Sequence, residues 1–245
     1  MNVNINDSLV VILVGGFGTR VKHLLNDIPK PLAIVHSKPF LYWIVKFYYD
    51  RGYRNVVLAC HYNHNYFYDF VNEISFEGLL INIVLENSPL GTAGSFLNVY
   101  HKYNYYKNYI VHNGDTYFNY NQEIINNFYD NSYNLEIIAK EMNDCSRYGS
   151  LFIDKDSNLI SFTEKKPGIG LINTGIYLIS NKILSMFRYD FNVLSFEYDF
   201  FPMLLNNNFQ IKVHISYDDF IDIGTEGSLK SSENFMGKVL LNDEM

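Results

Sequence analysis

The sequence predicts an α/β protein with a doubly wound, mostly parallel sheet, and three observations support this fold class. Residues 9–14 form an unbroken apolar run rich in β-branched side chains, which is typical of a strand buried on both faces. A second buried strand is expected at 55–60 and a third strand at 79–85, and segments with helical character separate all three. Strands that alternate with helices in this way are expected to lie parallel, with helices covering the sheet.

The first helix is expected to begin at Pro39, because Phe40, Ile44 and Tyr48 share one face at helical spacing. Gly52 is a suitable stop, since the position after a helix often requires a left-handed backbone. The other elements expected in this half are a helix within residues 61–74, a helix after the loop at 88–95, and a strand at 109–112.

The second half has a different character. Its expected strands lie at 135–140, 150–153, 159–163 and 173–179, with a turn at 154–158. No helical pattern separates these strands, which indicates a small β-rich lobe on the sheet. A final helix is expected from Glu226 to about Met236. The chain is predicted to be one domain, residues 1–245, with a first half at about 8–134 and a second at about 135–245.

The composition is that of an ordinary globular protein, with 48% hydrophobic residues in a chain of 245. The net charge of −7 argues against general binding to nucleic acid. Cys60 and Cys145 are too few for a disulfide framework, so we expect buried thiols in a reducing cytoplasm. The polar N-terminus does not resemble a signal peptide, and no apolar run is long enough to span a membrane.

A glycine-rich turn, Gly15-Gly16-Phe17-Gly18-Thr19-Arg20, directly follows the first strand. Such turns expose backbone N–H groups and form concave anion sites, and Arg20 and Lys30 add charge that suits phosphate oxygens. The turn lacks the Lys-Ser/Thr pair of a P-loop, and Val21 stands where a dinucleotide fingerprint needs its last glycine. The stretch therefore predicts another kind of polyphosphate site. A plain glycine-rich turn beside two surface cations is the simpler alternative.

Two further loops lie at expected strand ends. Leu90-Gly91-Thr92-Ala93-Gly94 precedes a helix that Thr92 could cap. Asn113-Gly114-Asp115 follows a strand, where a carboxylate is well placed to hold Mg²⁺ against a nucleotide phosphate. Each loop also has a structural alternative: a glycine-rich entry into a helix for the first, and a turn in which Asp115 caps a helix for the second.

Together with Pro29-Lys30-Pro31, the glycine-rich turn resembles the signature of the sugar-1-phosphate nucleotidyltransferases, the pyrophosphorylase family that makes NDP-sugars. The resemblance extends over about residues 8–230. It implies a Rossmann-like sheet of the nucleotide-diphospho-sugar transferase type, a nucleotide-binding first half and a sugar-phosphate-binding second half. The other matching segments are Leu90–Gly94, Gly114-Asp115, Arg147-Tyr148-Gly149, Phe162-Thr163-Glu164-Lys165, Asn173-Thr174-Gly175-Ile176-Tyr177 and Phe220-Ile221-Asp222-Ile223-Gly224-Thr225.

The resemblance also implies roles for individual residues. Arg20, Lys30 and Asp115 would be catalytic, and Asp115 and Asp222 would hold Mg²⁺. The implied nucleotide-binding residues are Leu13, Gly15, Gly16, Gly18, Thr19, Arg20, Lys30, Gly91, Thr92, Ala93 and Gly94. The implied sugar-phosphate-binding residues are Asn113, Gly149, Glu164, Lys165, Asn173 and Thr174. The family commonly reads Glu-Lys-Pro where this chain reads Glu164-Lys165-Lys166-Pro167, so Lys166 is an alternative to Lys165.

In the implied reaction, a phosphate oxygen of a sugar 1-phosphate attacks the α-phosphorus of an NTP, and pyrophosphate leaves. The nucleophile is already anionic, so the reaction needs positioning and charge neutralisation rather than a protein base. The segment Pro89–Gly94 is more similar to guanylyltransferases than to thymidylyltransferases, which favours GTP. The short single-domain form, with the turn at 15–20 and residues 171–175, is most similar to D-glycero-α-D-manno-heptose 1-phosphate guanylyltransferases, which serve surface polysaccharide biosynthesis.

Other functions stay open at this point. Mannose 1-phosphate guanylyltransferases and N-acetylmuramate 1-phosphate uridylyltransferases share most of these motifs. A non-catalytic nucleotide-sugar sensor is a further alternative, which the presence of Arg20, Lys30, Asp115 and Asp222 disfavours. A kinase-like phosphoryl transfer would release NDP instead of pyrophosphate. Homodimers are common in this family, and neither a nucleic acid nor a membrane is expected as a partner.

Overall fold

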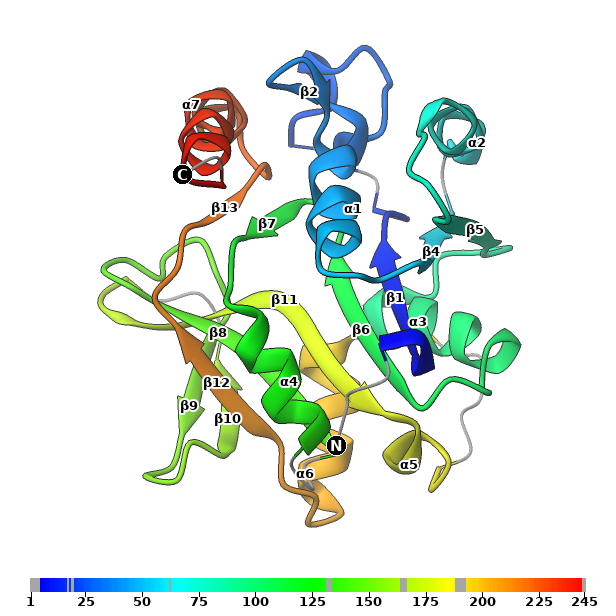
Figure 1. Ribbon diagram of the computed structural model, residues 1–245. Coiled ribbons are helices and arrows are strands. Elements are labelled where there is room, and N and C mark those ends of the chain that lie inside the picture. Colours follow the sequence, from blue (N-terminus) through cyan, green and yellow to red (C-terminus); the bar gives the residue numbers. More distant parts are fainter. Residues whose placement is uncertain are drawn as a thin grey trace.

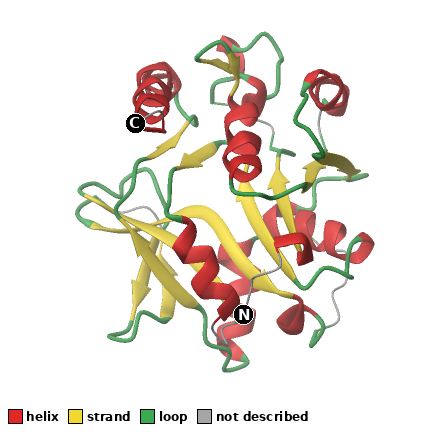
Figure 2. Cartoon of the chain, in the orientation of Figure 1, coloured by secondary structure: helices red, strands yellow, loops and turns green. Residues whose placement is uncertain are grey.

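The computed structural model describes residues 5–16, 18, 20–61, 63–130, 134–163, 167–187 and 193–243. A mixed β-sheet runs through the molecule, and helices cover both of its faces (Figures 1 and 2). Its strands are β1 (Ser8–Leu13), β4 (Asn55–Cys60), β5 (Leu80–Leu85), β6 (Asn108–Asn113), β8 (Leu135–Met142), β9 (Ser150–Ile153), β10 (Leu159–Thr163), β11 (Gly170–Ser180) and β12 (Lys212–Ser216). The predicted α/β fold class is confirmed.

The helices and the short strands complete the structure. The helices are α1 (Phe40–Asp50), α2 (His64–Glu73), α3 (Gly91–Lys102), α4 (Gln122–Asp130), α5 (Asn181–Leu184), α6 (Phe201–Asn206) and α7 (Glu226–Asp243). A π-helical turn, Phe196–Phe200, leads into α6, and 3₁₀ turns lie at Ile5–Asp7, Lys22–Leu24 and Lys30–Leu32. Two small sheets pair β2 (Ile34–Val35) with β3 (Lys38–Pro39) and β7 (Thr116–Phe118) with β13 (Phe220–Asp222). No described helix is long and apolar enough to cross a membrane.

The winding of the sheet changes direction at β1. Strand β1 is parallel to β4 on one side and to β6 on the other, and β5 extends the sheet beyond β4. Beyond β6 the order continues through β11, which is antiparallel to β6 and β8. In doubly wound sheets, ligands bind at the carboxyl ends of the strands on either side of such a switch point. The loops after β1 and β6 lie at this position.

The sheet separates two apolar cores. Val10 of β1 belongs to the core that α1, α2, α4 and α7 cover, whereas Val11 belongs to the core under α3, α5 and α6. Successive residues of a strand face opposite sides, so both faces of β1 are buried. This burial explains the unbroken apolar run in the sequence. Cys60 and Cys145 are buried free thiols, as expected, and burial raises the pKa of the Cys60 thiol.

The structure corrects several element boundaries and adds elements. Helix α1 begins at Phe40 rather than Pro39, and Gly52 follows its end with a φ of +91°, as expected. The described part of the second helix covers only His64–Glu73. Strands β7, β12 and β13, and helices α4, α5 and α6, were not expected from the sequence. The strands are short, and each is defined by pairing with a strand that is distant in the sequence, which local periodicity does not record.

Candidate active site

The loops after β1 and β6 are held side by side by the register of the sheet. Leu13, the last residue of β1, pairs with Asn113, the last residue of β6. The backbone N–H of Gly114 donates to the carbonyl of Leu13 at 2.9 Å. The glycine-rich turn and the Asn113–Asp115 turn therefore start from adjacent points at the carboxyl edge of the sheet.

Two cavities open at this edge. The first has a volume of about 340 Å³, and we name it the base-side cavity because it contains most of the described residues expected to bind the nucleotide. It is lined by Leu13, Val14, Gly15, Gly16, Gly18, Lys30, Pro31, Glu86, Pro89, Leu90, Gly91, Thr92, Ser95, Asn113 and Asp115. The second has a volume of about 550 Å³, and we name it the sugar-side cavity because it contains most of the described residues expected to bind the sugar phosphate. It is lined by Gly18, Arg20, Val21, Lys30, Asn113, Asp115, Thr116, Ser146, Arg147, Tyr148, Asn173, Thr174, Phe220, Asp222, Gly224 and Thr225. They share Gly18, Lys30, Asn113 and Asp115. Two ligands, one in each cavity, would meet at these four residues.

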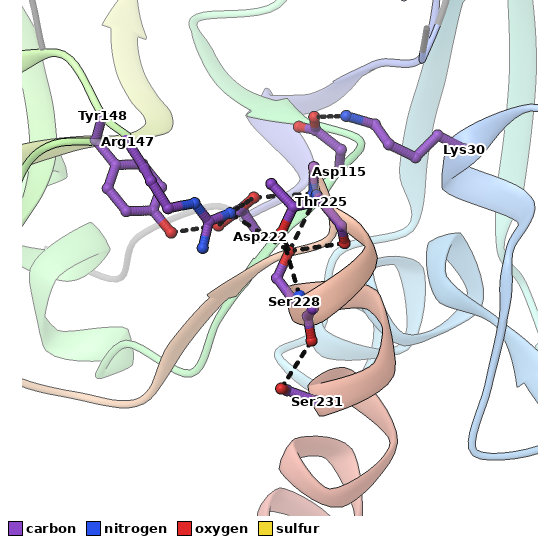
Figure 3. Close-up of polar contacts among 10 residues, drawn as sticks. Lys30, Asp115, Arg147, Tyr148, Asp222, Thr225, Ser228 and Ser231 are labelled. Atoms are coloured by element: carbon purple, nitrogen blue, oxygen red, sulfur yellow. Dashed lines mark hydrogen bonds and ion pairs between the residues drawn. The ribbon is translucent and has the colours of Figure 1, made fainter. Parts of the chain in front are cut away.

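An ion pair stands at the junction of the cavities. Lys30 begins a 3₁₀ turn after Pro29, and its Nζ donates to Oδ2 of Asp115 (Figure 3). The two side chains are 16% and 33% exposed, so the pair is partly shielded but remains accessible to a ligand. The junction thus offers an ammonium group and a carboxylate next to each other. Two of the residues predicted to be catalytic therefore lie together.

A second carboxylate, Asp222, lies next to Asp115 in space. Asp222 ends β13 and pairs with Thr116 of β7, and the N–H of Ile223 donates to the carbonyl of Asp115 at 2.9 Å. The guanidinium of Arg147 donates through Nη2 to both oxygens of Asp222 at 2.9 Å, and the Tyr148 hydroxyl also donates to this carboxylate (Figure 3). Burial, followed by the contact with Asp222, raises the pKa of Tyr148.

These two carboxylates fit a hard divalent cation. Asp115 directly precedes Thr116, the β7 residue that pairs with Asp222, and both carboxylates line the sugar-side cavity. Carboxylate oxygens are ligands that Mg²⁺ prefers, and Mg²⁺ usually keeps several waters or substrate oxygens. No group of three or more His, Cys, Asp or Glu suited to a metal occurs among the described residues, so substrate and water would complete the coordination. A metal would also compete with Lys30 and Arg147 for these oxygens.

The entry into α3 differs from the expectation. Gly91 and Thr92 line the base-side cavity, but Ala93 and Gly94 do not. The N–H groups of Ala93 and Gly94 donate to the carbonyl of Leu194, at 2.9 and 3.1 Å. Thr92 is not the N-cap, because α3 begins at Gly91. These N-terminal amides hold residue 194 in place, so they are not free to bind a nucleotide.

Glu86, which was not predicted as a site residue, lies in the wall of the base-side cavity. It follows β5, so its carboxylate reaches the same edge of the sheet. The Ser95 hydroxyl donates to Oε1, and the N–H of Leu90 donates to Oε2 at 3.1 Å. The available signal in the sequence was an acidic residue at the end of a strand: Glu86 directly follows β5, and Asp115 lies two residues after β6.

Arg20 lines the sugar-side cavity and is not part of the base-side wall. Its side chain is exposed and has no hydrogen-bond or ion-pair partner within the described ranges, so it is free to bind an anion. Thr19, predicted with it, lies outside the described residues. Arg20 was expected among the nucleotide-binding residues. It lies two residues after Gly18, which both cavities share, so sequence position could not separate the two cavities.

The predicted sugar-phosphate residues have different environments. Asn113, Asn173 and Thr174 line the sugar-side cavity, but the Thr174 hydroxyl donates to the carbonyl of Ile138 at 2.6 Å. Gly149 is not in the wall; its carbonyl accepts a hydrogen bond from the N–H of Asn173 at 3.2 Å. The remaining predicted residues, Glu164 and Lys165, and the alternative Lys166 lie outside the described part of the chain.

Comparison with known proteins identifies the family. Residues 9–238 match the nucleotidyl transferase family. The D-glycero-α-D-manno-heptose 1-phosphate guanylyltransferase of Campylobacter jejuni subsp. jejuni serotype O:2 is 35% identical, over 87% of this chain and 93% of that protein. The corresponding protein of Aneurinibacillus thermoaerophilus is 31% identical, over 91% and 96%. The crystal structure of HddC from Yersinia pseudotuberculosis complexed with GMP-PN has a TM-score of 0.81 and 35% identity, over 93% of this chain and 99% of that chain.

The match spans nearly the whole chain and includes both strands and both turns that form the junction of the two cavities. A glycine-rich turn, a lysine and two carboxylates at the switch point of a doubly wound sheet are a suitable arrangement for two phosphorylated substrates. The chain therefore belongs to the nucleotidyl transferase family and is a nucleotidyltransferase enzyme.

Proposed function

We propose that the protein transfers a guanylyl group from GTP to D-glycero-α-D-manno-heptose 1-phosphate, giving GDP-heptose and pyrophosphate. The observation that carries this proposal is the pair of cavities that share Gly18, Lys30, Asn113 and Asp115. A nucleotide in the base-side cavity and a sugar phosphate in the sugar-side cavity would bring their phosphates together at Lys30. The names of the two relatives support the choice of heptose, and the guanine nucleotide GMP-PN in the HddC complex supports the choice of GTP.

The reaction forms one P–O bond and breaks another. An oxygen of the sugar 1-phosphate attacks the α-phosphorus of GTP, and the bond from that phosphorus to the β-bridging oxygen breaks. Pyrophosphate leaves with the electron pair. No proton has to be removed from the attacking oxygen, so the residues contribute position and charge. Lys30 neutralises phosphate charge at the junction, and Arg20 adds a free guanidinium in the sugar-side cavity.

We infer that Asp115 and Asp222 hold Mg²⁺ in the loaded enzyme. Such an ion would supply positive charge to the phosphates. The residues of this chain must first release these carboxylates, since Lys30 binds Asp115 and Arg147 binds Asp222. Lys30 and Arg147 would then be available to substrate oxygens. The exchange of partners keeps the charges compensated when the phosphates enter.

Glu86 accounts for the preference for guanine in this proposal. The Watson–Crick edge of guanine carries two neighbouring donors, N1–H and N2–H₂, whereas adenine has a bare N1 acceptor at the corresponding position. A carboxylate is an acceptor with about four lone-pair sites, and Ser95 and Leu90 use two of them. Glu86 thus keeps accepting capacity in the wall of the base-side cavity.

The test is pyrophosphate release in the presence of Mg²⁺. GTP, ATP, CTP, UTP and dTTP are each combined with D-glycero-α-D-manno-heptose 1-phosphate, mannose 1-phosphate and N-acetylmuramate 1-phosphate. We expect kcat/KM to be highest for GTP with the heptose phosphate. Another preferred pair would replace the base or the sugar, and release of GDP would contradict the reaction type. GTP binding in calorimetry without turnover of any sugar phosphate would favour a sensor.

A further inference from the structure

Asn173 is bound within the protein in a way that limits what it can offer a ligand. Its Oδ1 accepts the N–H of Gly175 at 3.0 Å, and its Nδ2 donates to the Tyr177 hydroxyl at 2.8 Å and to Oε1 of Glu197 at 3.0 Å. An asparagine amide has two donor hydrogens and two acceptor lone pairs. Both hydrogens are used, so the remaining capacity of this side chain is one lone pair on Oδ1.

Glu197 and Gly175 together determine this orientation of the amide. A carboxylate only accepts and a backbone N–H only donates, so both partners favour the same one of the two amide orientations. The Tyr177 hydroxyl can donate or accept, and therefore favours neither. Its own hydrogen is directed to Oε1 of Glu197 at 3.2 Å. The carboxylate of Glu197 is therefore the side-chain group that keeps Nδ2 of Asn173, rather than Oδ1, directed towards it. Replacing this carboxylate would remove that constraint.

Glu197 itself is held at a defined position. The Ser195 hydroxyl donates to its Oε2 at 2.8 Å. The segment before it is fixed to the start of α3, because Leu194 accepts two N–H groups of that helix and the N–H of Phe196 donates to Oγ1 of Thr92 at 3.0 Å. Residues 194–197 therefore connect the wall of the base-side cavity to Asn173 in the wall of the sugar-side cavity.

We propose that Glu197 is a positioning residue for the sugar phosphate, which holds Asn173 so that it presents only an acceptor to a hydroxyl group of the sugar. This inference rests on the proposed function, because it assigns the sugar to the cavity that Asn173 lines. It concerns a residue outside the segments from which the resemblance to the family was drawn. The ligand group that Asn173 recognises is a donor, so a sugar lacking that hydroxyl would gain nothing from Glu197.

The first experiment compares two carboxylates of the same segment. Glu197→Gln keeps the size of the side chain but removes its charge and offers a donor as well as an acceptor. We expect the KM for the sugar 1-phosphate to rise about tenfold or more, and the KM for GTP to stay within about twofold. Asp199→Asn is the matched control, since Asp199 accepts the N–H of Ser195 at 2.7 Å and does not bind Asn173. It should leave both KM values unchanged.

The second experiment exchanges donor and acceptor. Asn173→Asp alone places two carboxylates in contact, and we expect the KM for the sugar 1-phosphate to rise well above that of Glu197→Gln. Adding Glu197→Gln to Asn173→Asp restores a donor–acceptor pair with the roles reversed. The KM of the double variant for the sugar 1-phosphate should be at least about tenfold lower than that of Asn173→Asp. A merely structural role of Glu197 would not produce this recovery.

The outcomes separate this inference from the proposed function. If the wild-type enzyme releases no pyrophosphate with any sugar 1-phosphate, the proposed function fails, and the inference fails with it. If the wild type is active but Glu197→Gln keeps its sugar-phosphate KM, or changes both KM values equally, only the role of Glu197 is overturned. The role of Glu197 is also overturned if the double variant has the same sugar-phosphate KM as Asn173→Asp, with circular dichroism showing that both proteins are folded.

Discussion

At the scale of single residues, the carboxylates of Asp115 and Asp222 already have charged partners. Lys30 binds Asp115, and Arg147 binds Asp222. Partly buried charges are costly when they are unpaired, so these pairs keep the site stable before substrates enter. The same groups are suited to phosphates and a cation, because a ligand of the right charge can replace each partner. Stability and binding thus depend on the same side chains.

Lys30 is expected to matter for turnover more than for folding. We predict that Lys30→Met lowers kcat by about 10²–10³, because it removes a preorganised positive charge at the junction of the cavities. Steady-state kinetics with the preferred substrates measure this loss. Lys102→Met, at an exposed position of α3, is the control and should leave kcat unchanged. An unchanged kcat for Lys30→Met would remove this residue from the catalytic group.

Glu86 is expected to control the choice of base. We predict that Glu86→Gln lowers the ratio of kcat/KM for GTP over ATP by about 10- to 100-fold, since a matched pair of hydrogen bonds to a base edge contributes about 1–3 kcal/mol. The measurement is the ratio of the two kcat/KM values. Glu73→Gln, on the exposed side of α2, serves as the control. Equal losses for both nucleotides would show that Glu86 supports the loop without reading the base.

At the scale of elements, the start of α3 shows how a family motif serves the structure. Gly91 has a φ of +73°, and a Cβ there would stand 2.5 Å from the carbonyl oxygen of Leu194. That carbonyl accepts the N–H groups of Ala93 and Gly94. A larger residue cannot enter without displacing it. The glycine is therefore needed for the approach of a distant segment as well as for the backbone conformation.

Gly91→Ala is predicted to lower the free energy of unfolding by about 1–3 kcal/mol, because it combines an unfavourable φ with overlap at the Leu194 carbonyl. Urea denaturation measures the change. Gly227→Ala is the control, since a Cβ at this position in α7 meets nothing within 4 Å and its φ is not positive. It should leave the stability unchanged or slightly raised. Equal stabilities for both variants would contradict the close approach.

At the scale of the whole molecule, the site lies where the two halves of the sheet join. Strand β6 ends the parallel half and pairs with β11 of the other half. Asn113 at the end of β6 occupies the space beside Gly175 of β11, where a Cβ would overlap its side-chain amide. Each half thus shapes one cavity, and the junction belongs to both. A change in either half is expected to reach the reacting groups.

The pH dependence of stability is a property of the whole fold, and two buried groups contribute with opposite signs. Burial lowers the pKa of His112 from 6.5 to about 3, so below pH 6.5 the unfolded chain binds a proton that the folded chain does not. Stability from this group is lost as the pH falls towards 3, by at most about 1.4 kcal/mol per pH unit. Burial raises the pKa of Glu136 from 4.5 to about 7, so its contribution is lost as the pH rises from 4.5 to 7.

Two variants separate these contributions. The free energy of unfolding of the wild type minus that of His112→Asn should shrink as the pH is lowered from 7 to 5, because only the wild type loses stability through this histidine. For Glu136→Gln, the free energy of unfolding of the wild type minus that of the variant should instead shrink as the pH rises from 4.5 to 7. Denaturation curves across this range provide the measurement. Parallel pH profiles for the wild type and a variant would contradict the corresponding assignment.

Much of the fold and part of the site could be predicted from the sequence. The buried strand that ends at Leu13 and the stop of α1 at Gly52 follow from local patterns, because burial on both faces and a left-handed turn each restrict residue type. Asp115 was assigned from its position after a strand together with the resemblance of Gly114-Asp115 to the family, since the position alone also fits a structural turn. Ala93 and Gly94 were assigned to the nucleotide, but their amides bind Leu194, which no local pattern indicates.

The sequence by itself determined the alternation of strands and helices, the glycine-rich turn and the polar residues at the strand ends, since these depend on neighbours in the chain. Only the tertiary structure decided which groups meet. Lys30 and Asp115 are 85 residues apart, and Asn173 and Glu197 are 24 apart. Their contacts depend on the register of β1 and β6 and on the packing of residues 194–197 against α3. Register and packing are set by the whole core, so they become visible only when the chain has folded.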